Sequence, residues 1–193
     1  MDPGELLIRD LAASDRAALA FIFSRLGEQS RYQRFLAVKR RLDPAELDRL
    51  STPDHWHHGA LIAFSPVPRA PIGVARYVRT GDFELAELAV SVVDEWQRRG
   101  VGEALMLALR DRALRAGIRR FSATLYRSNR GALALVRRLG PCSVTGSHGD
   151  VIELSGSWLR KGLDGEGTMR EHRDTVRAAP GAGQSSAAVT AWG

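Results

Sequence analysis

Residues 84–105 read ELAELAVSVVDEWQRRGVGEAL, which predicts a strand, a glycine-bearing turn and then a helix. A helix that begins at Val101 leaves its first four backbone N–H groups without intrahelical acceptors, and the turn at Gln97–Gly102 adds further amides. The turn contains two arginines and two glycines: Arg98, Arg99, Gly100 and Gly102. The glycines permit a positive φ and close approach of a ligand, and the arginines add positive charge. An ordinary strand–turn–helix junction is the alternative, but the spacing favours an anion-binding pocket that fits a pyrophosphate.

The size and composition of the chain predict one compact domain. At 193 residues and 44% apolar content, it can bury a single sizeable core. Its longest apolar runs, such as Leu61–Phe64 and Leu88–Val93, are too short to span a bilayer, and Met1–Glu5 lacks the pattern of a secretory signal. We therefore expect a soluble cytoplasmic protein without a membrane partner. The single cysteine, Cys142, excludes an internal disulfide and a cysteine-based zinc site.

The formal charge of +6 raises the possibility of nucleic-acid binding. The arginines are scattered along the chain, however, and the longest basic run is Lys39-Arg40-Arg41. There is no interleaved set of aromatic residues on which bases would stack. A nucleic-acid partner is therefore not favoured, and the sequence does not constrain the oligomeric state.

Hydrophobic periodicity predicts strands and helices over most of the first 158 residues. The expected strands are Leu6–Arg9, Leu61–Phe64, Ile72–Val78, Glu84–Val93, Phe121–Tyr126, Cys142–Thr145 and Val151–Leu154. The expected helices begin at Ser14, Asp43, Val101 and Asn129 and end near Leu26, Leu50, Ala116 and Leu139. After Trp158 the chain becomes rich in Gly, Ala and Ser. We therefore expect a domain at residues 1–160 and a disordered tail at 161–193.

The spacing Gln97-x-x-Gly100-x-Gly102 resembles the acetyl-coenzyme A signature of the GNAT acetyltransferases. A second motif, Asn129-Arg130-Gly131-Ala132, resembles that family's Asn-x-x-Ala helix. Further short segments resemble the catalytic domain of bacterial Pat-type protein lysine acetyltransferases: Arg31–Phe35, Leu50–His55, Gly73–Tyr77 and Ala86–Ala89. The resemblance covers roughly residues 5–155 and is a match of pattern.

This resemblance implies an α/β (α+β) architecture, the GNAT fold. Its mixed, mostly antiparallel sheet of about six to seven strands is flanked by helices, and a parallel pair of strands splays apart at the cofactor site. Acetyl-CoA is the implied co-substrate. The residues implied to bind it are Val90, Ser91, Val92, Gln97, Arg98, Arg99, Gly100, Val101, Gly102, Glu103 and Asn129. A backbone N–H near Val92 is implied to stabilise the oxyanion as the amine attacks the thioester.

Glu87 matches the catalytic glutamate of the Pat-type enzymes, which implies that it is a general base. An attacking lysine must lose a proton whose unperturbed pKa is about 10.4, and a nearby carboxylate can accept it directly or through water. Glu87 lies four residues before Ser91 and so on the same face of the expected strand. The alternative is a solvent-facing edge residue, since Leu88 and Val90 alternate away from it. We favour the catalytic role because of the resemblance.

One position departs from the family pattern. Many GNAT enzymes carry a tyrosine seven residues after the asparagine of the Asn-helix, where it protonates the departing thiolate, and this chain has Val136 there. The coenzyme A thiolate then leaves without a tyrosine acid, or Tyr126 or Ser128 substitutes, or the domain binds acyl-coenzyme A and turns it over poorly. The usual Gly-Phe after that helix is also replaced, by Gly140-Pro141.

The residues outside these motifs do not predict a metal site. His55, His57 and His58 lie close in sequence, but Asp54 is the only other residue at ligand spacing. We interpret them as a loop before the Leu61 strand. Cys142 is interpreted as a small buried residue rather than a nucleophile.

The resemblance implies an acetyltransferase that moves acetyl from acetyl-CoA to a primary amine, with protein lysine as the preferred acceptor. A small polyamine, an aminoglycoside or an N-terminal α-amine is the alternative acceptor. A non-catalytic acyl-CoA sensor is the alternative from a different class of function, and Val136 favours it.

Overall fold

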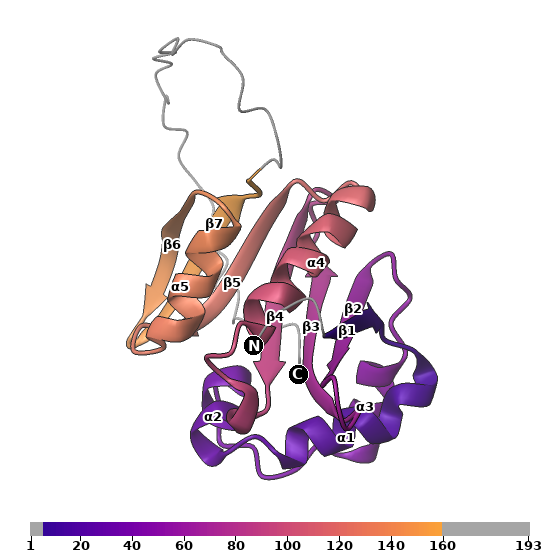
Figure 1. The fold of residues 1–193 in the computed structure, drawn as a ribbon. Helices are drawn as coiled ribbons and strands as arrows, with labels where there is room; N and C mark the ends of the chain where they lie inside the picture. Colours follow the sequence, from indigo (N-terminus) through magenta and orange to yellow (C-terminus); the bar gives the residue numbers. More distant parts are fainter. Residues whose placement is uncertain (1–5, 160–193) are drawn as a thin grey trace, which may run out of the picture. The chain divides into compact units, whose positions relative to one another are not determined.

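The computed structural model describes residues 6–159, which form a seven-stranded sheet with helices packed against it (Figure 1). The strands are β1 (Leu7–Asp10), β2 (His58–Phe64), β3 (Pro71–Arg79), β4 (Leu85–Val92), β5 (Arg120–Tyr126), β6 (Cys142–His148) and β7 (Val151–Ser157). The α-helices are α1 (Arg16–Ser24), α2 (Glu28–Phe35), α3 (Pro44–Ser51), α4 (Val101–Arg115) and α5 (Arg130–Leu139). Short 3₁₀ turns, η2 (Ala13–Asp15) and η3 (Asp94–Trp96), precede α1 and follow β4.

The sheet order is β1-β2-β3-β4-β5-β7-β6, and every neighbouring pair is antiparallel except β4 with β5. The predicted mixed, mostly antiparallel GNAT sheet is therefore confirmed. The 15-residue α4 packs over β2, β3 and β4, and α5 contacts α4 and β5. The helix α1 packs against β3, and α2 lies against β4 and β5.

Side-chain alternation places α1 and α4 on opposite faces of the sheet. Gly73 on β3 faces α4, since a Cβ added there would lie 2.9 Å from a methyl of Leu105. The adjacent Val74 lines a small hollow together with Leu19 and Ile22 of α1. Because successive strand residues point to opposite faces, each strand contributes to both apolar layers.

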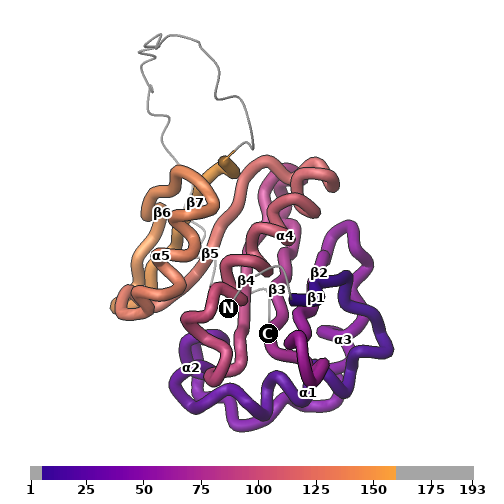
Figure 2. Tube along the Cα trace, viewed as in Figure 1, coloured from indigo at the N-terminus to yellow at the C-terminus, as the bar shows by residue number. Residues whose placement is uncertain are grey.

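The parallel pair β4 and β5 separates after a short paired region. Their register runs only from Leu85↔Arg120 to Glu87↔Ser122, whereas β5 pairs with β7 over its whole length. Figure 2 shows the two strands diverging beyond that region. The predicted splayed pair is therefore confirmed, and the remainder of β4 borders an opening rather than a strand.

The elements differ from the sequence-based expectations mainly around β2 and α2. The strand expected from Leu61 begins at His58, and both strands of the last hairpin are longer than expected. The helix α2 was not predicted. No helix within residues 6–159 has the length and apolar content needed to cross a bilayer. The predicted tail at 161–193 lies outside the described residues.

Candidate active site

The hydrogen-bond register of β4 decides which of its backbone groups face the opening. Val93 N–H donates to Ile72 O at 2.9 Å, and Thr80 N–H donates to Leu85 O at 3.1 Å. Both bonds fit the β3–β4 register, in which Gly73 lies opposite Val92. Because hydrogen-bonded positions alternate along an antiparallel pair, every second residue of β4 directs its N–H and C=O away from β3, toward β5.

Val90 and Val92 are the residues of this set beyond the paired region, so their main-chain groups border the opening. Ser91 instead belongs to the β3–β4 ladder opposite Val74, and its side chain lies on the α1 face, where it lines the hollow. The C=O of Val92 accepts from Gln97 Nε2 at 3.1 Å. Three residues of β4 were predicted to bind the cofactor. Val90 and Val92 border the opening with their main chains, whereas the main chain of Ser91 pairs with β3.

Two residues of the turn before α4 have backbone conformations that suit an anion-binding loop. Arg98 and Gly100 both adopt left-handed backbone conformations, with φ of 57° and 82°. This conformation is costly for the arginine, and such strain clusters at ligand-binding sites. The helix then begins at Val101, so its first amides are directed out of the N-terminus, where the helix dipole favours an anion.

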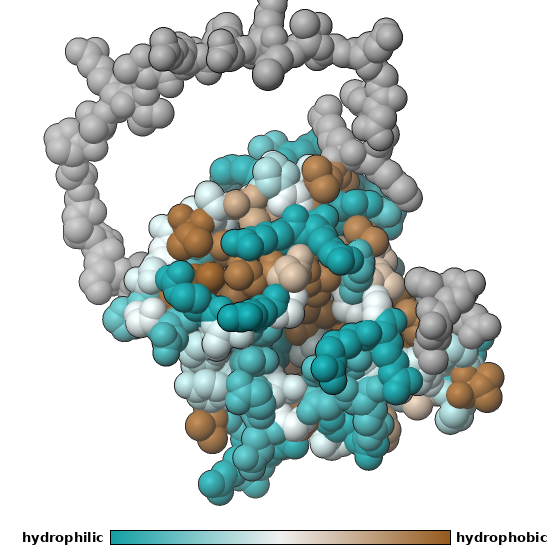
Figure 3. All heavy atoms as spheres, turned by 60° about the vertical axis from the view of Figure 1, so that its left-hand side comes forward, coloured by the Kyte–Doolittle hydropathy of each residue, from teal (hydrophilic) through white to brown (hydrophobic). Residues whose placement is uncertain are grey.

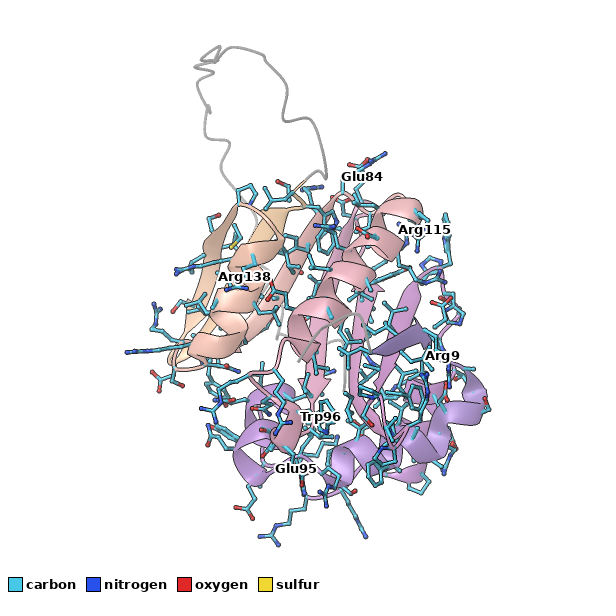
Figure 4. All side chains as sticks on the ribbon, in the orientation of Figure 1. Arg9, Glu84, Glu95, Trp96, Arg115 and Arg138 are labelled. Atoms are coloured by element: carbon cyan, nitrogen blue, oxygen red, sulfur yellow. The ribbon has the colours of Figure 1, made fainter. Side chains whose placement is uncertain are left out.

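The side chains around this turn leave room above the helix start. A Cβ added at Gly100 would meet no atom within 4 Å, and one added at Gly102 would make an ordinary contact of 3.5 Å with Leu135 of α5. The guanidinium of Arg99 lies 5.4 Å from the ring centroid of Trp96. Glu103, in the first turn, pairs with Arg138 of α5 at 2.7 Å. Figure 4 labels Trp96 and Arg138 and shows them on either side of the N-terminal end of α4.

Glu87 lies at the last position where β4 and β5 pair, and its side chain lies on the α1–α2 face with Ser91. Oε1 of Glu87 accepts from the Thr124 hydroxyl of β5 at 3.4 Å. The negative charges of Glu87 and Glu46 also favour the charged form of Arg34 on α2. Glu87 therefore stands at the apex of the opening, between β5 and α2.

Two arginines that the sequence analysis did not single out, Arg34 and Arg76, line the hollow on this face together with Ser91. Burial lowers the pKa of Arg34 to about 10 despite the attraction of Glu87. Burial, and then repulsion from Arg34, lowers the pKa of Arg76 to about 9. Arg76 is 3% exposed and donates to Leu50 O at 3.2 Å. Both guanidinium groups remain charged at neutral pH, so two positive charges lie on the α1–α2 side of β4, where Glu87 and Glu46 carry the opposite charge.

Tyr126 is the last residue of β5, and its side chain lies on the same face. Its ring stacks on the ring of Tyr32 of α2, with ring centroids 4.9 Å apart. Its hydroxyl donates to Leu36 O at 3.4 Å. A hydrogen bond with Tyr32, together with burial, raises the pKa of Tyr126 to about 12. The stack joins β5 to α2 across the wide end of the opening.

Asn129 lies at the N-terminus of α5, and Val136 lies in its second half. Asn129 caps that helix, its Oδ1 accepting from Ala132 N–H at 3.0 Å. Val136 is 5% exposed and packs in the core. The position where many family members carry a tyrosine therefore holds a buried aliphatic side chain with no proton to donate.

The histidines lie at the start of β2, away from a common centre. His55 has φ of 61°, and His58 Nε2 lies 3.1 Å from Arg76 Nη1. Within the described residues, no three His, Cys, Asp or Glu side chains are grouped to hold a metal ion. Cys142 is half-buried on the outermost strand, β6, rather than fully buried as expected.

Apolar surface also lies near these elements. On the face that Figure 3 brings forward, which includes the α5 and β7 side of the molecule, apolar side chains lie in a hollow rimmed by hydrophilic ones. On the opposite face from α4, the small hollow lined by Ser91 and Arg76 has a volume of about 30 Å³.

Comparison with known proteins relates this geometry to one family. The model of the acetyltransferase (GNAT) family matches residues 28–140. The chain is 30% identical over 141 residues to Acetyltransferase PA5475 of Pseudomonas aeruginosa, a match that covers 72% of this chain and 76% of that protein. It is 34% identical over 110 residues to Acetyltransferase Pat of Mycolicibacterium smegmatis, covering 56% of this chain but only 33% of that protein. The GNAT domain of S. lividans PAT superposes with a TM-score of 0.71 at 23% identity, covering 81% of this chain and 99% of that domain.

Proposed function

Because the chain belongs to the acetyltransferase (GNAT) family, we propose that it transfers the acetyl group of acetyl-CoA to a protein lysine side chain. The observation that carries this proposal is the opening between β4 and β5. It has an anion-binding turn at one end, main-chain groups of Val90 and Val92 along its side, and the carboxylate of Glu87 at its apex.

Acetyl-CoA is the co-substrate, and the residues of the opening fit its parts. The pyrophosphate binds at the amides of Gly100–Glu103, with Arg98 and Arg99 supplying positive charge. The pantetheine arm lies in the opening, where its amides bond the main chain of Val90 and Val92. Asn129 holds the arm from the start of α5, the helix whose Leu135 lies beside Gly102.

Transfer proceeds directly in a ternary complex. The lysine arrives as an ammonium ion, Glu87 accepts its proton through intervening water, and the neutral nitrogen attacks the thioester carbonyl carbon. The carbonyl oxygen becomes an oxyanion, which the Val92 N–H stabilises. The new C–N bond forms, the C–S bond breaks, and the coenzyme A sulfur leaves with the electron pair. The second proton of the nitrogen passes to solvent.

The leaving group departs as a thiolate without help from a tyrosine. Even a cysteine thiol, with an unperturbed pKa of about 8.5, is more acidic than Tyr126, whose pKa is raised to about 12. Proton transfer from Tyr126 to the thiolate would therefore be uphill. Val136 has no proton to give, and the low basicity of the thiolate makes protonation unnecessary.

The choice of lysine as acceptor is supported by the match to the Pat acetyltransferase, whereas Glu87 could deprotonate any primary amine that enters on the face opposite α4. The buried Val136 favours a second candidate, an acyl-CoA sensor that binds the cofactor and turns it over poorly.

Release of coenzyme A, measured with a panel of acceptors, tests the proposal. The panel contains a protein substrate mixture, a lysine peptide with a blocked N-terminus, a peptide with a free α-amine and no lysine, and spermidine. The proposal predicts acetyl-CoA binding together with turnover of the blocked lysine peptide. If only the α-amine peptide or only spermidine is turned over, that amine and not lysine is the acceptor. Binding with no turnover of any acceptor would favour the sensor.

A further inference from the structure

The N-terminus of α2 has no cap of its own. Its N-cap residue is Gly27, which has no side chain to accept a hydrogen bond from the first turn. Asp94 in η3, 67 residues later, supplies the other half of a capping box: its Oδ2 accepts from the N–H of the N-cap residue itself, Gly27, at 3.0 Å. Its Oδ1 accepts from the Ser30 hydroxyl at 2.7 Å. A carboxylate at this end of a helix is also favoured by the helix dipole.

This remote cap is tied to the turn that precedes α4. Gln97 Nε2 lies within hydrogen-bonding distance of Asp94 Oδ1 at 2.9 Å, Ser30 Oγ at 3.1 Å and Val92 O at 3.1 Å. Val92 ends β4 at the opening, and Gln97 opens the anion-binding turn. One side chain therefore joins the end of β4, the turn and the start of α2.

Apart from this cap, α2 is held by contacts of single side chains, among them Arg31 with Leu26 O and the ring pair Phe35–Phe23. It is eight residues long, and none of its residues is fully buried. A helix this short is marginal without packing or capping, because the first turn is costly to form. Yet α2 carries Arg34, whose charge interacts with Glu87, and Tyr32, which stacks on Tyr126. The acceptor side of the opening thus depends on a helix whose end is fixed by Asp94.

We propose that Asp94 is a positioning residue for the acceptor: by capping α2 it holds Arg34 and Tyr32 over the β4–β5 opening, beside Glu87. This role rests on the proposed function, since the acceptor enters on the face that α2 covers. Asp94 acts through α2 and is not assigned a contact with either substrate.

The geometry offers a second way to break the same contact. A Cβ at Gly27 would lie 2.5 Å from Asp94 Oδ2, so Gly27→Ala displaces the carboxylate without removing it. The backbone of Gly27, with φ of −66° and ψ of 167°, accepts alanine without strain. The adjacent Glu95 is a matched control, because it lies on the same short 3₁₀ turn as Asp94. Its ion pair with Arg25 is exposed, and exposed ion pairs contribute little to stability.

The experiment measures acceptor KM, acetyl-CoA Kd and amide hydrogen exchange in residues 28–35 for Asp94→Ala, Gly27→Ala, the double variant and Glu95→Gln. We expect acceptor KM to rise about fivefold to tenfold in both single variants, the change produced by losing a typical cap. The Kd of acetyl-CoA should rise less than the acceptor KM, because Gln97 keeps its bonds to Val92 O and Ser30 Oγ, and exchange in 28–35 should accelerate. The double variant should resemble the single ones, because both remove one contact. Glu95→Gln should match the wild type.

Additive effects, unchanged exchange in residues 28–35, or equal losses in KM and Kd would overturn the positioning role. Failure of the proposed function looks different. The wild type would then release no coenzyme A with any amine, while the exchange measurement would still report whether Asp94 caps α2.

Discussion

The Thr124 hydroxyl of β5 donates to Glu87 Oε1 of β4 at 3.4 Å, just past the point where the two strands stop pairing. This bond spans the narrow end of the opening and orients the carboxylate from one strand while Arg34 of α2 lies on its other side. Because Glu87 is held from both sides, its substitution should affect the chemical step more than the binding of the cofactor.

We expect Glu87→Gln to lower kcat about a hundredfold or more, because the isosteric amide cannot accept the proton of the incoming ammonium ion. The Kd of acetyl-CoA should stay within about twofold of the wild type. Steady-state kinetics over pH 6 to 10, with calorimetry of the cofactor, measure both quantities.

Thr124→Val is the control for this variant, since it removes the hydroxyl and leaves the carboxylate. Its kcat should fall only a fewfold. Equal rates for Glu87→Gln and wild type at every pH would remove Glu87 from the mechanism.

Tyr126→Phe should leave kcat within about threefold of the wild type. The ring still stacks on Tyr32, and a hydroxyl whose pKa is about 12 does not protonate a thiolate efficiently. Pre-steady-state release of coenzyme A gives the rate of the chemical step. A loss of a hundredfold or more would show that Tyr126 is the proton donor after all.

Gly100→Asp should weaken acetyl-CoA binding tenfold or more, because it places a negative charge where the pyrophosphate binds. Gly100→Asn is the matched variant: asparagine tolerates a φ of 82° about as well as aspartate and carries no charge. Its affinity should fall at most a fewfold. Thermal melting with and without cofactor compares the two variants, and similar losses in both would mean that backbone strain rather than charge is responsible.

Acid should destabilise the fold partly through His58. Its burial and the nearby Arg76 lower its pKa to about 4, against an unperturbed value of about 6.5. The unfolded chain therefore binds a proton more readily than the folded one between these values. The free energy of unfolding should decrease as pH falls through this window.

His58→Gln removes the titrating group. Urea unfolding at pH 7.0, 5.5 and 4.5 should show the stability advantage of the wild type shrinking as pH falls. An advantage that is constant across pH would mean that His58 contributes by packing alone.

The sequence predicted the elements whose signals are local. Short apolar segments marked β3 and β4, and two glycines with a helical pattern marked the turn and α4. The helix α2 was missed because its sequence, EQSRYQRF, has no buried stripe and its cap is 67 positions away. No local pattern contains that contact.

The same distinction separates the predicted from the unpredicted parts of the site. Glu87 and the Gln97–Gly102 turn lie in one continuous motif, so the resemblance identified them as candidates. Arg34 and Thr124 come from other elements and meet Glu87 only after folding. Arg76 had a usable signal, since it is a charged residue within the buried strand Pro71–Arg79. A charge there requires a partner or a function.

The alternation of β4 also determines which genetic changes the cofactor site tolerates. The strand offers main-chain amides and carbonyls to the opening, so replacing Val90 or Val92 by isoleucine or threonine leaves every one of those donors and acceptors in place. Insertion or deletion of one residue between Leu85 and Val90 would exchange the two edges of the strand and turn its side chains to the opposite faces. Such conservative substitutions at Val90 and Val92 should therefore accumulate with little loss of activity, whereas a single-codon frame-preserving insertion should abolish it.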